Sequence, residues 1–372
     1  MTPITKKIGV LGAGQLGRML AIAGYPLGQK FGFYGVSDDE PSALLGRMHK
    51  STQGSEDEAQ SLKQLVEFAD VVTYESENTD IAMVQDIQKS TMVYPPIEAL
   101  FVAQHRGREK TTFHRLGIPC AKFAVVTSLE ALKESAEIIS FPSIAKTTTE
   151  GYDGKGQYLL RDEDDIEKAW VALGEREIIL EGFVDYQREL SMVAVRNEKG
   201  DCVFYPLVQN VHHQGILRYT IAPAQNVSDY AQEQAERYMQ KLLEDMNYVG
   251  VLTLELFETD YGLLANEMAP RVHNSGHWTI EGAQTSQFEN HVRAITGLPL
   301  GSTEPKQPIA GMINIIGETG PVEKVLQNPK AHLHLYDKAE REGRKLGHIT
   351  ILAETQDELF AEIKSLNDFL PL

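Results

Sequence analysis

The first hundred residues alternate short apolar segments with amphipathic ones, and this alternation constrains the fold more than any other feature. An apolar strand is predicted over residues 7–11, a tight turn follows, and residues 18–24 continue as a helix. Further strands are expected over 31–36, 70–74 and 92–94. Strands that alternate with helices form parallel sheets with right-handed crossovers. We therefore predict an α/β chain that begins with a Rossmann-like parallel sheet.

The turn after the first strand carries Gly12, Gly14 and Gly17 in the spacing G-x-G-x-x-G, and Asp38 follows about twenty residues later. This pattern is typical of dinucleotide-binding folds. A helix N-terminus attracts an anion because its free backbone N–H groups and its dipole both favour negative charge. The motif does not name the anion. A nicotinamide or flavin cofactor and another phosphorylated small molecule therefore both stay open.

Charge and composition exclude several classes of partner. The 35 Lys and Arg residues face 53 Asp and Glu residues, which gives a formal charge of −18. Such a balance argues against nucleic acid and against anionic membrane surfaces. No run of the sequence approaches the roughly 18 apolar residues of a membrane span. Cys120 and Cys202 match no metal-ligand pattern, so we expect buried free thiols in a cytoplasmic protein.

A predicted strand over 142–146 ends in Lys146 and is followed by a glycine-rich segment, 151–157. Glycines on both sides of Lys155 can form a flexible cover whose backbone N–H groups meet phosphate oxygens. The spacing does not fit a Walker A loop. A plain glycine hairpin is the alternative, and the neighbouring Lys146 makes the phosphate cover the preferred interpretation.

Glu255 and Glu267 are expected on paired antiparallel strands, where the two carboxylates face one another. Carboxylates at that range repel unless a cation lies between them, and oxygen ligands beside phosphates suit Mg²⁺. A solvent-facing acidic pair is the alternative. The apolar neighbours Leu254, Leu256 and Phe257 oppose it, because carboxylates on a buried strand need a partner.

The segment 266–278 is the densest run of polar side chains, with a carboxylate, a guanidinium, two imidazoles and two carboxamides. We interpret it as a junction of metal, phosphate and substrate, since binding residues gather in loops. Glu189 alone would be a surface residue of a strand. His212 and His213 are adjacent on a strand and point to opposite faces, so they cannot serve one site.

Together these segments resemble the ATP-grasp superfamily and, within it, the N5-carboxyaminoimidazole ribonucleotide synthetase family of purine biosynthesis. The resemblance covers nearly the whole chain. Val272 and Ser76 depart from the family pattern, which usually has proline and a bulkier residue there, and they place local loop shape in doubt. The resemblance rests on the motifs at 12–19, 75–78, 151–157, 181–184, 266–278 and 343–348, together with Lys146 and Glu255.

The resemblance implies three domains: a pre-ATP-grasp domain over 1–105, an ATP-grasp domain over 106–298 with a lid at about 120–190, and a small, mostly β domain over 299–372. It implies that ATP phosphorylates bicarbonate to carboxyphosphate. Carboxyphosphate then supplies CO₂ to the amine of 5-aminoimidazole ribonucleotide, and ADP and phosphate leave. The cofactors implied are ATP and Mg²⁺, and a homodimer is expected.

The resemblance also assigns residues. Catalytic roles fall on Asp153, Lys155, Arg271 and His273, with Asp153 orienting, or accepting a proton from, the attacking amine. ATP is assigned to Arg106, Lys146, Gly151, Tyr152, Asp153, Gly154, Lys155, Gly156, Gln157, Glu181, Gly182, Phe183, Val184, Glu189, His212, Asn266 and Glu267. The ribonucleotide is assigned to Gln15, Leu16, Glu77, Tyr152, Asp153, Arg271, His273, Asn274, Arg344 and Lys345. The metal is assigned to Glu255 and Glu267.

Three other functions compete with this interpretation. A dehydrogenase would use the turn at 12–17 but would leave Glu255, Glu267 and the segment 151–157 without a role. A non-catalytic regulator would bind ATP without turnover, which the carboxylates and cations disfavour. Another ATP-grasp carboxylate–amine ligase, or another purine-pathway enzyme that uses formate or bicarbonate, is the main alternative.

Overall fold

The N-terminal part of the protein is a four-stranded parallel sheet, as predicted. The structure is a computed structural model that describes residues 4–51, 54–55, 57–149 and 156–366. The strand order is β3-β2-β1-β4, and every neighbouring pair is parallel. The predicted strand at 92–94 is wrong, because there Val93 forms one isolated bridge to Val72. The elements are β1 (Lys7–Leu11), α1 (Gln15–Gly24), β2 (Lys30–Gly35), β3 (Arg47–Lys50), α2 (Glu58–Phe68), β4 (Val71–Tyr74) and α3 (Ile81–Gln88).

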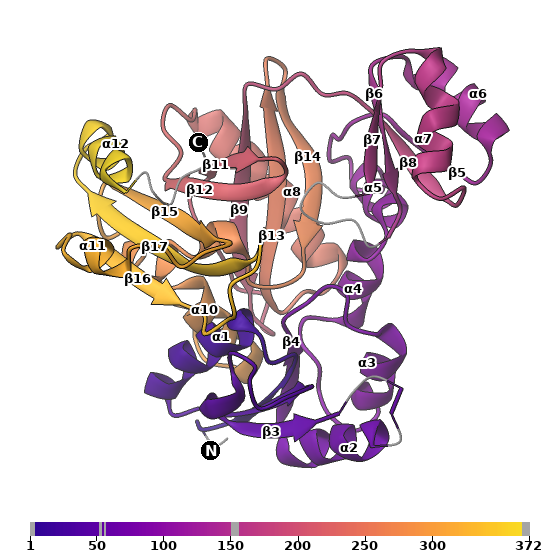
Figure 1. The fold of residues 1–372 in the computed structure, drawn as a ribbon. Helices are drawn as coiled ribbons and strands as arrows, with labels where there is room; N and C mark the ends of the chain where they lie inside the picture. Colours follow the sequence, from indigo (N-terminus) through magenta and orange to yellow (C-terminus); the bar gives the residue numbers. More distant parts are fainter. Residues whose placement is uncertain (1–3, 52–53, 56, 150–155, 367–372) are drawn as a thin grey trace.

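Two helices lead from this sheet to a small antiparallel sheet that stands apart at the upper right of Figure 1. Its strand order is β5-β8-β6-β7, and α6 and α7 pack against it around Leu132, Trp170 and Leu180. Lys146 lies on a strand of this sheet, just before the segment 151–157, whose first five residues are outside the described chain. The elements are α4 (Ile97–Ala103), α5 (Arg106–Arg115), β5 (Phe123–Val126), α6 (Leu129–Ile139), β6 (Ser143–Thr147), β7 (Gln157–Leu160), α7 (Ile166–Ala172) and β8 (Ile178–Gly182).

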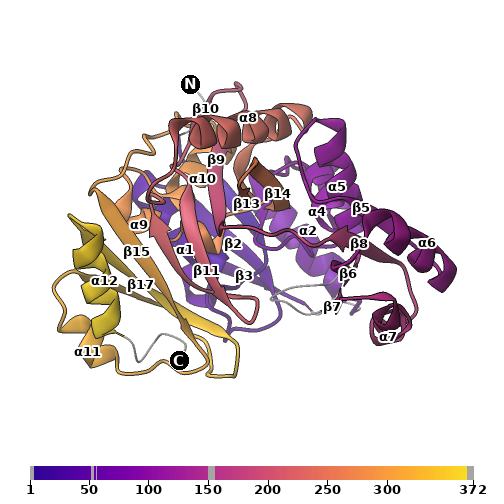
Figure 2. The same cartoon turned by 90° about the horizontal axis from the view of Figure 1, so that it is seen from above.

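A nine-stranded sheet forms the centre of the molecule, with the order β14-β13-β9-β11-β12-β15-β17-β16 and β10 paired to β9. Three strands of the segment 299–372, β15, β17 and β16, extend this same sheet rather than forming a separate one. Figure 2 shows α8 running along one face of it. The elements are β9 (Arg188–Arg196), β10 (Cys202–Phe204), β11 (Val208–His213), β12 (Ile216–Ala222), α8 (Asp229–Asp245), β13 (Gly250–Thr259), β14 (Gly262–Ala269), α9 (Thr279–Gly282), α10 (Gln287–Thr296), β15 (Ile309–Ile316), α11 (Val322–Leu326), β16 (Ala331–Leu335), β17 (Lys345–Ala353) and α12 (Gln356–Ser365).

Side-chain alternation along β9 divides the core into two layers. Leu190 and Met192 pack under α8, whereas Val193 and Val195 face the opposite way, toward α1 and α10. Successive strand residues point to opposite faces. Ser191 therefore shares the α10 face, and its direct partner on β13, Glu255, lies beside it. This polar pair lies in an otherwise apolar layer and marks where the site is built.

The structure shows the surroundings of three residues that the sequence analysis discussed. Cys120 and Cys202 are free, as predicted, although each is half-buried rather than fully enclosed. Val272, which departs from the family pattern, is buried in the hydrophobic core between the N-terminal and central sheets. Across the described residues, no helix combines the length and the apolar character needed to cross a membrane.

Candidate active site

The glycine turn of the N-terminal sheet is occupied by a carboxylate of the protein itself. Glu75 follows β4, and its two oxygens accept hydrogen bonds from the backbone N–H groups of Gly14 (2.6 Å) and Gly17 (2.8 Å). A Cβ at Gly14 would stand 2.7 Å from the Glu75 Oε1 atom, so this close approach requires glycine. The anion predicted for this helix N-terminus is therefore Glu75, and the dinucleotide interpretation of the turn fails.

A half-buried ion pair joins the N-terminal domain to the central part of the molecule. The guanidinium of Arg271 meets the Glu77 carboxylate through Nε and through Nη2, the latter 2.9 Å from Oε1, while Nη1 donates to the Val272 carbonyl. Burial would raise the pKa of Glu77, but the charge and hydrogen bonds of Arg271 outweigh burial and lower that pKa to about 2. Both residues were assigned to the ribonucleotide pocket, and the structure brings them together.

A second cluster lies where α5 meets the small sheet. Glu181 is buried, with its Oε2 atom 2.9 Å from the Lys146 ammonium and 3.7 Å from that of Lys110. Burial would raise the pKa of Glu181, but these two lysines outweigh it and hold the pKa at about 2. Arg106, one turn before Lys110, pairs with Glu267 at 3.1 Å. Four residues assigned to ATP thus lie around Lys110, which the sequence analysis did not single out.

The central sheet contributes a third cluster, around Glu255. Its Oε1 atom lies 3.2 Å from His273 Nε2. Burial would raise the pKa of Glu255, but the hydrogen bond from His273 and the charges of His212 and Lys345 lower it, so the carboxylate is ionised. His212 in turn lies 2.6 Å from Glu189, while His213 is exposed, which answers the question of which histidine faces inward.

The two predicted metal ligands lie at an irregularity of the β13–β14 pairing. Leu254 pairs with Met268 and Leu256 pairs with Ala265, so Glu255 alone stands opposite Asn266 and Glu267. Among the described residues, no group of three or more His, Cys, Asp or Glu side chains could hold a metal ion. Two carboxylates nonetheless fit Mg²⁺, which usually takes few protein ligands and completes its shell with water and phosphate oxygens.

The other assigned residues surround these clusters. Gln15 accepts a hydrogen bond from Lys338 (3.0 Å), Asn274 exchanges hydrogen bonds with Asn314, and Leu16 packs against the core. Arg344 donates to the Ala339 carbonyl. Gly182 ends β8 and is followed by Phe183 and Val184, and Gly156 precedes Gln157, the first residue of β7. Five assigned residues lie outside the described chain: Gly151, Tyr152, Asp153, Gly154 and Lys155.

Lys338 is a cation that the sequence reasoning missed. It lies between Gln15 and the basic residues of the segment 341–345. Burial, followed by the charges of Arg344 and other cations, lowers the pKa of Lys338 to about 8, although Glu75 opposes that shift. A group of basic side chains thus lies beside the glycine turn of an acidic protein.

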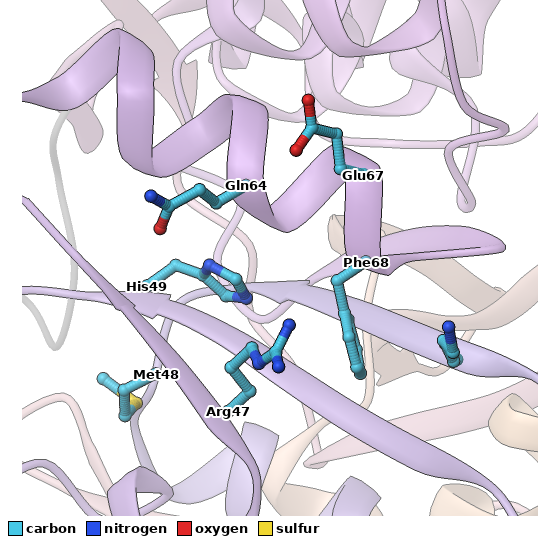
Figure 3. Close-up of a pocket in the computed structure, with 7 residues that line it drawn as sticks. Arg47, Met48, His49, Gln64, Glu67 and Phe68 are labelled. Carbon is cyan, nitrogen blue, oxygen red and sulfur yellow. The ribbon is translucent and has the colours of Figure 1, made fainter.

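A separate hollow of about 510 Å³ lies between β3 and α2 and is shown in Figure 3. It is lined by Lys7 and Arg47, the first residues of their strands, and by His49 and Phe68. The glycine turn follows the opposite, carboxyl end of β1. This hollow is therefore remote from the three clusters, and ligands of open parallel sheets bind at the carboxyl ends of the strands.

Comparison with protein families assigns a class to this arrangement. Residues 5–104 match the ribonucleotide synthetase preATP-grasp domain, residues 111–288 the ATP-grasp domain, and residues 310–362 the phosphoribosylaminoimidazole carboxylase C-terminal domain. The fold and the site therefore define an ATP-grasp enzyme.

Individual relatives narrow the class. The chain is 47% identical to N5-carboxyaminoimidazole ribonucleotide synthase of Pseudomonas aeruginosa, over 96% of this chain and 97% of that one. The crystal structure of the synthetase from Thermus thermophilus matches with a TM-score of 0.93 and 46% identity, over 98% and 99% of the two chains. The Aspergillus clavatus enzyme in complex with ADP and 5-aminoimidazole ribonucleotide matches with a TM-score of 0.90 and 33% identity, over 98% of each chain. This chain belongs to the N5-carboxyaminoimidazole ribonucleotide synthase family of ATP-dependent enzymes.

Proposed function

We propose that this chain carboxylates the exocyclic amine of 5-aminoimidazole ribonucleotide in purine biosynthesis. ATP transfers its terminal phosphoryl group to bicarbonate, which gives carboxyphosphate and ADP. Carboxyphosphate then delivers CO₂ to the amine, phosphate leaves, and the amine loses a proton as the carbamate forms. The observation that carries the proposal is that segment 266–274 contacts both charged clusters: Glu267 pairs with Arg106 on the side of Lys146, and Arg271 pairs with Glu77 on the side of the glycine turn.

In this proposal the nucleotide lies beside Lys110, Lys146, Arg106 and the glycine-rich segment 151–157. Lysine ammonium groups carry three donors each, so those that contact Glu181 keep donors for phosphate oxygens. Mg²⁺ held by Glu255 and Glu267 would supply charge that stabilises the transferring phosphoryl group. Carboxyphosphate is short-lived in water, which makes a cover such as 151–157 necessary.

The ribonucleotide lies on the other side, between the glycine turn and the C-terminal strands. Lys338, Arg344 and Lys345 supply positive charge for its phosphate, which an acidic protein must bind in a local basic pocket. Glu77 and Arg271 form the wall, and Asp153 orients the attacking amine. A homodimer is part of the proposal, and light scattering of the purified chain tests it.

A coupled ADP-release assay tests the reaction. We expect ADP release that requires bicarbonate and rises on addition of 5-aminoimidazole ribonucleotide, with N5-carboxyaminoimidazole ribonucleotide as the product. ADP release that responds to a different amine or carboxylate would favour another ATP-grasp ligase. Asp153→Ala should preserve ATP binding and lower turnover by about 100-fold or more, in the range of general acid–base contributions. Near-normal turnover of that variant would remove Asp153 from the mechanism.

A further inference from the structure

A line of buried polar side chains runs through the central sheet to His273. It begins at Thr220 on β12, passes through Asn210 on β11 and Ser191 on β9, and ends at Ser275 beside His273. Thr220, Ser191 and Ser275 are fully buried and Asn210 is 5% exposed. Each contact is 2.8 or 2.9 Å long. Four buried polar groups in a row are costly unless all are satisfied, so their arrangement calls for an explanation.

The register of the sheet explains how these side chains meet. Asn210 lies directly opposite Thr220, and Glu255 lies directly opposite Ser191. Ser191 pairs with Val208, which is two residues from Asn210 and on the same face. Diagonal neighbours of this kind are within reach of polar side chains. Ser191 therefore lies beside Glu255, and Ser275 lies beside His273, so the row contacts both partners of the His273–Glu255 pair.

The direction of the hydrogen bonds follows from the chemistry of each group. A threonine hydroxyl that meets the Asn210 oxygen must donate, and this turns the Asn210 NH₂ group toward the Ser191 oxygen. Ser191 then accepts from Asn210 and gives its own proton to Ser275 Oγ. Ser275 Oγ accepts this hydrogen bond and keeps its own proton, which it can donate to His273 Nδ1 at 2.9 Å.

The backbone leads to the same conclusion. His273 Nδ1 also accepts from the backbone N–H of Ser275 at 3.3 Å, and an N–H group cannot act as an acceptor. Nδ1 therefore carries a lone pair. The proton of the neutral ring lies on Nε2, which faces Glu255 at 3.2 Å.

We propose that Thr220, Asn210, Ser191 and Ser275 are positioning residues that hold His273 in the Nε2–H tautomer. His273 then presents a hydrogen-bond donor, and not a base, at the place where Glu255 and the reacting groups meet. This Nε2–H donates to Glu255, so the ring fixes the orientation of a carboxylate that would hold Mg²⁺. This use of the donor rests on the proposed function, whereas the tautomer itself does not.

The tautomer is measured directly by nitrogen-15 NMR of histidine-labelled protein, with the His273 signals assigned by their loss in His273→Asn. In the wild-type enzyme, at a pH where the ring is neutral, we expect a protonated Nε2 and an unprotonated Nδ1. In Ser275→Ala the backbone N–H of residue 275 still reaches Nδ1, so we expect the Nδ1 signal to move only part of the way toward that of a protonated nitrogen. A protonated Nδ1 in the wild type would overturn the proposal, whether or not the chain turns over 5-aminoimidazole ribonucleotide.

Turnover gives the second readout. Loss of the Ser275 hydroxyl should lower kcat by about 10- to 100-fold while the KM for ATP changes by less than about twofold, as for other groups that orient a site residue. Thr220→Val keeps the shape of the side chain and should lower kcat by about two- to tenfold, the worth of one hydrogen bond. Thr220→Ser restores the hydroxyl and should restore kcat. A wild-type kcat in Ser275→Ala would contradict the positioning role of this row of side chains.

Thr253 supplies a matched control for the threonine variant. It is a fully buried threonine on β13, two residues before Glu255, and its hydroxyl has no hydrogen-bond partner in the described structure. Thr253→Val should leave kcat and the His273 shifts unchanged. A fall in kcat equal to that of Thr220→Val would mean that both substitutions act through packing. The positioning role of the row would then be rejected.

Discussion

Glu77 and Glu181 are both carboxylates whose pKa is lowered to about 2, yet they are held in different ways. Glu77 meets one guanidinium, and three of the five N–H donors of Arg271 are used by Glu77 and the Val272 carbonyl. Glu181 meets two lysines, Lys110 and Lys146, whose ammonium groups form no fixed fork. The charge of Glu77 is balanced by one cation, whereas Glu181 faces two cations and leaves one positive charge in excess.

The Arg271–Glu77 pair therefore fixes the geometry of the site, whereas the lysines around Glu181 can bind a ligand. The planar Arg271 fork fixes the 266–274 segment against the N-terminal domain, because bidentate pairs add geometry as well as energy. The lysines around Glu181 have donors to spare and lie next to a strand that leads into the glycine-rich segment. Loss of Arg271 and loss of Lys146 should therefore change the kinetic constants for the two substrates differently.

The largest effect is expected on the Arg271 side. Arg271→Ala should lower kcat/KM for 5-aminoimidazole ribonucleotide by about 1000-fold and lower the free energy of unfolding by about 1–3 kcal/mol, because Glu77, whose side chain is 31% exposed, loses its partner. Steady-state kinetics and urea unfolding measure the two quantities. Arg188 is the control, since its ion pair with Glu258 is at least as buried and joins β9 to β13 of the central sheet. Arg188→Ala should destabilise the protein while kcat stays near the wild-type value, and an equal loss of kcat would contradict a specific role for Arg271.

A smaller and more selective effect is expected for Lys146. Lys146→Ala should raise the KM for ATP by about 10- to 100-fold, the worth of one or two charge-assisted hydrogen bonds. The KM for 5-aminoimidazole ribonucleotide should change little, which is the contrast with Arg271. Lys133→Ala removes an exposed lysine of the same small sheet's helix, paired with Glu167, and should leave both constants unchanged. If both KM values rise together in Lys146→Ala, the division between the two sides is incorrect.

Much of the fold follows from the sequence because local patterns carry it. The parallel N-terminal sheet and the strands around Glu255 match the apolar periodicities that strands require. Strand β3 escaped prediction because a four-residue edge strand lacks a clean pattern. Helix α10 also escaped prediction, although its apolar residues Phe288, Val292 and Ile295 recur at helical spacing. That the C-terminal strands would join the central sheet depends on long-range pairing, which no local pattern contains.

The site was harder to predict where a residue's partner comes from another part of the chain. Lys110 lies in a helix with basic neighbours, and nothing in the sequence indicates that it is buried, with only 2% of its surface exposed. Glu75 appeared in a motif, but its capping of Gly14 and Gly17 joins residues about sixty positions apart in sequence. Lys338 likewise reaches Gln15 across the whole chain. These contacts are set by topology, so the sequence alone could supply only candidates.

Glu75 provides a third test, on the same side of the site as Glu77. Glu75→Gln turns one acceptor oxygen into an NH₂ group that faces the N–H of Gly14 or Gly17, which should cost about 1–3 kcal/mol of unfolding free energy. Asp162 is the control, because one of its oxygens accepts the backbone N–H of Asp164 at 3.0 Å. Asp162→Asn keeps that oxygen and should be nearly neutral. Equal destabilisation of the two variants in urea unfolding would show that the second Glu75 oxygen contributes nothing.

The smallest effect concerns Glu109, a buried carboxyl next to Lys110 that accepts the Met268 N–H at 2.7 Å. Burial raises the pKa of Glu109 to about 8, although Lys110 opposes the shift. The pKa in the folded state is then above the unfolded value, so the unfolded chain loses the proton first and binds fewer protons between those two pKa values. Stability must therefore fall as pH rises toward 8.

Glu109→Gln keeps the acceptor for Met268 and removes the titration. Between pH 7 and pH 8 the wild type should lose about 1 kcal/mol relative to this variant, since one pKa unit corresponds to 1.36 kcal/mol and the group titrates across that interval. Urea unfolding at the two pH values measures the difference, and the exposed Glu130→Gln should show none. Parallel pH profiles of the wild type and Glu109→Gln would mean that Glu109 is already ionised at neutral pH. The lysines on the ATP side would then face one more negative charge, and their excess of positive charge, which distinguishes them from Arg271, would be lost.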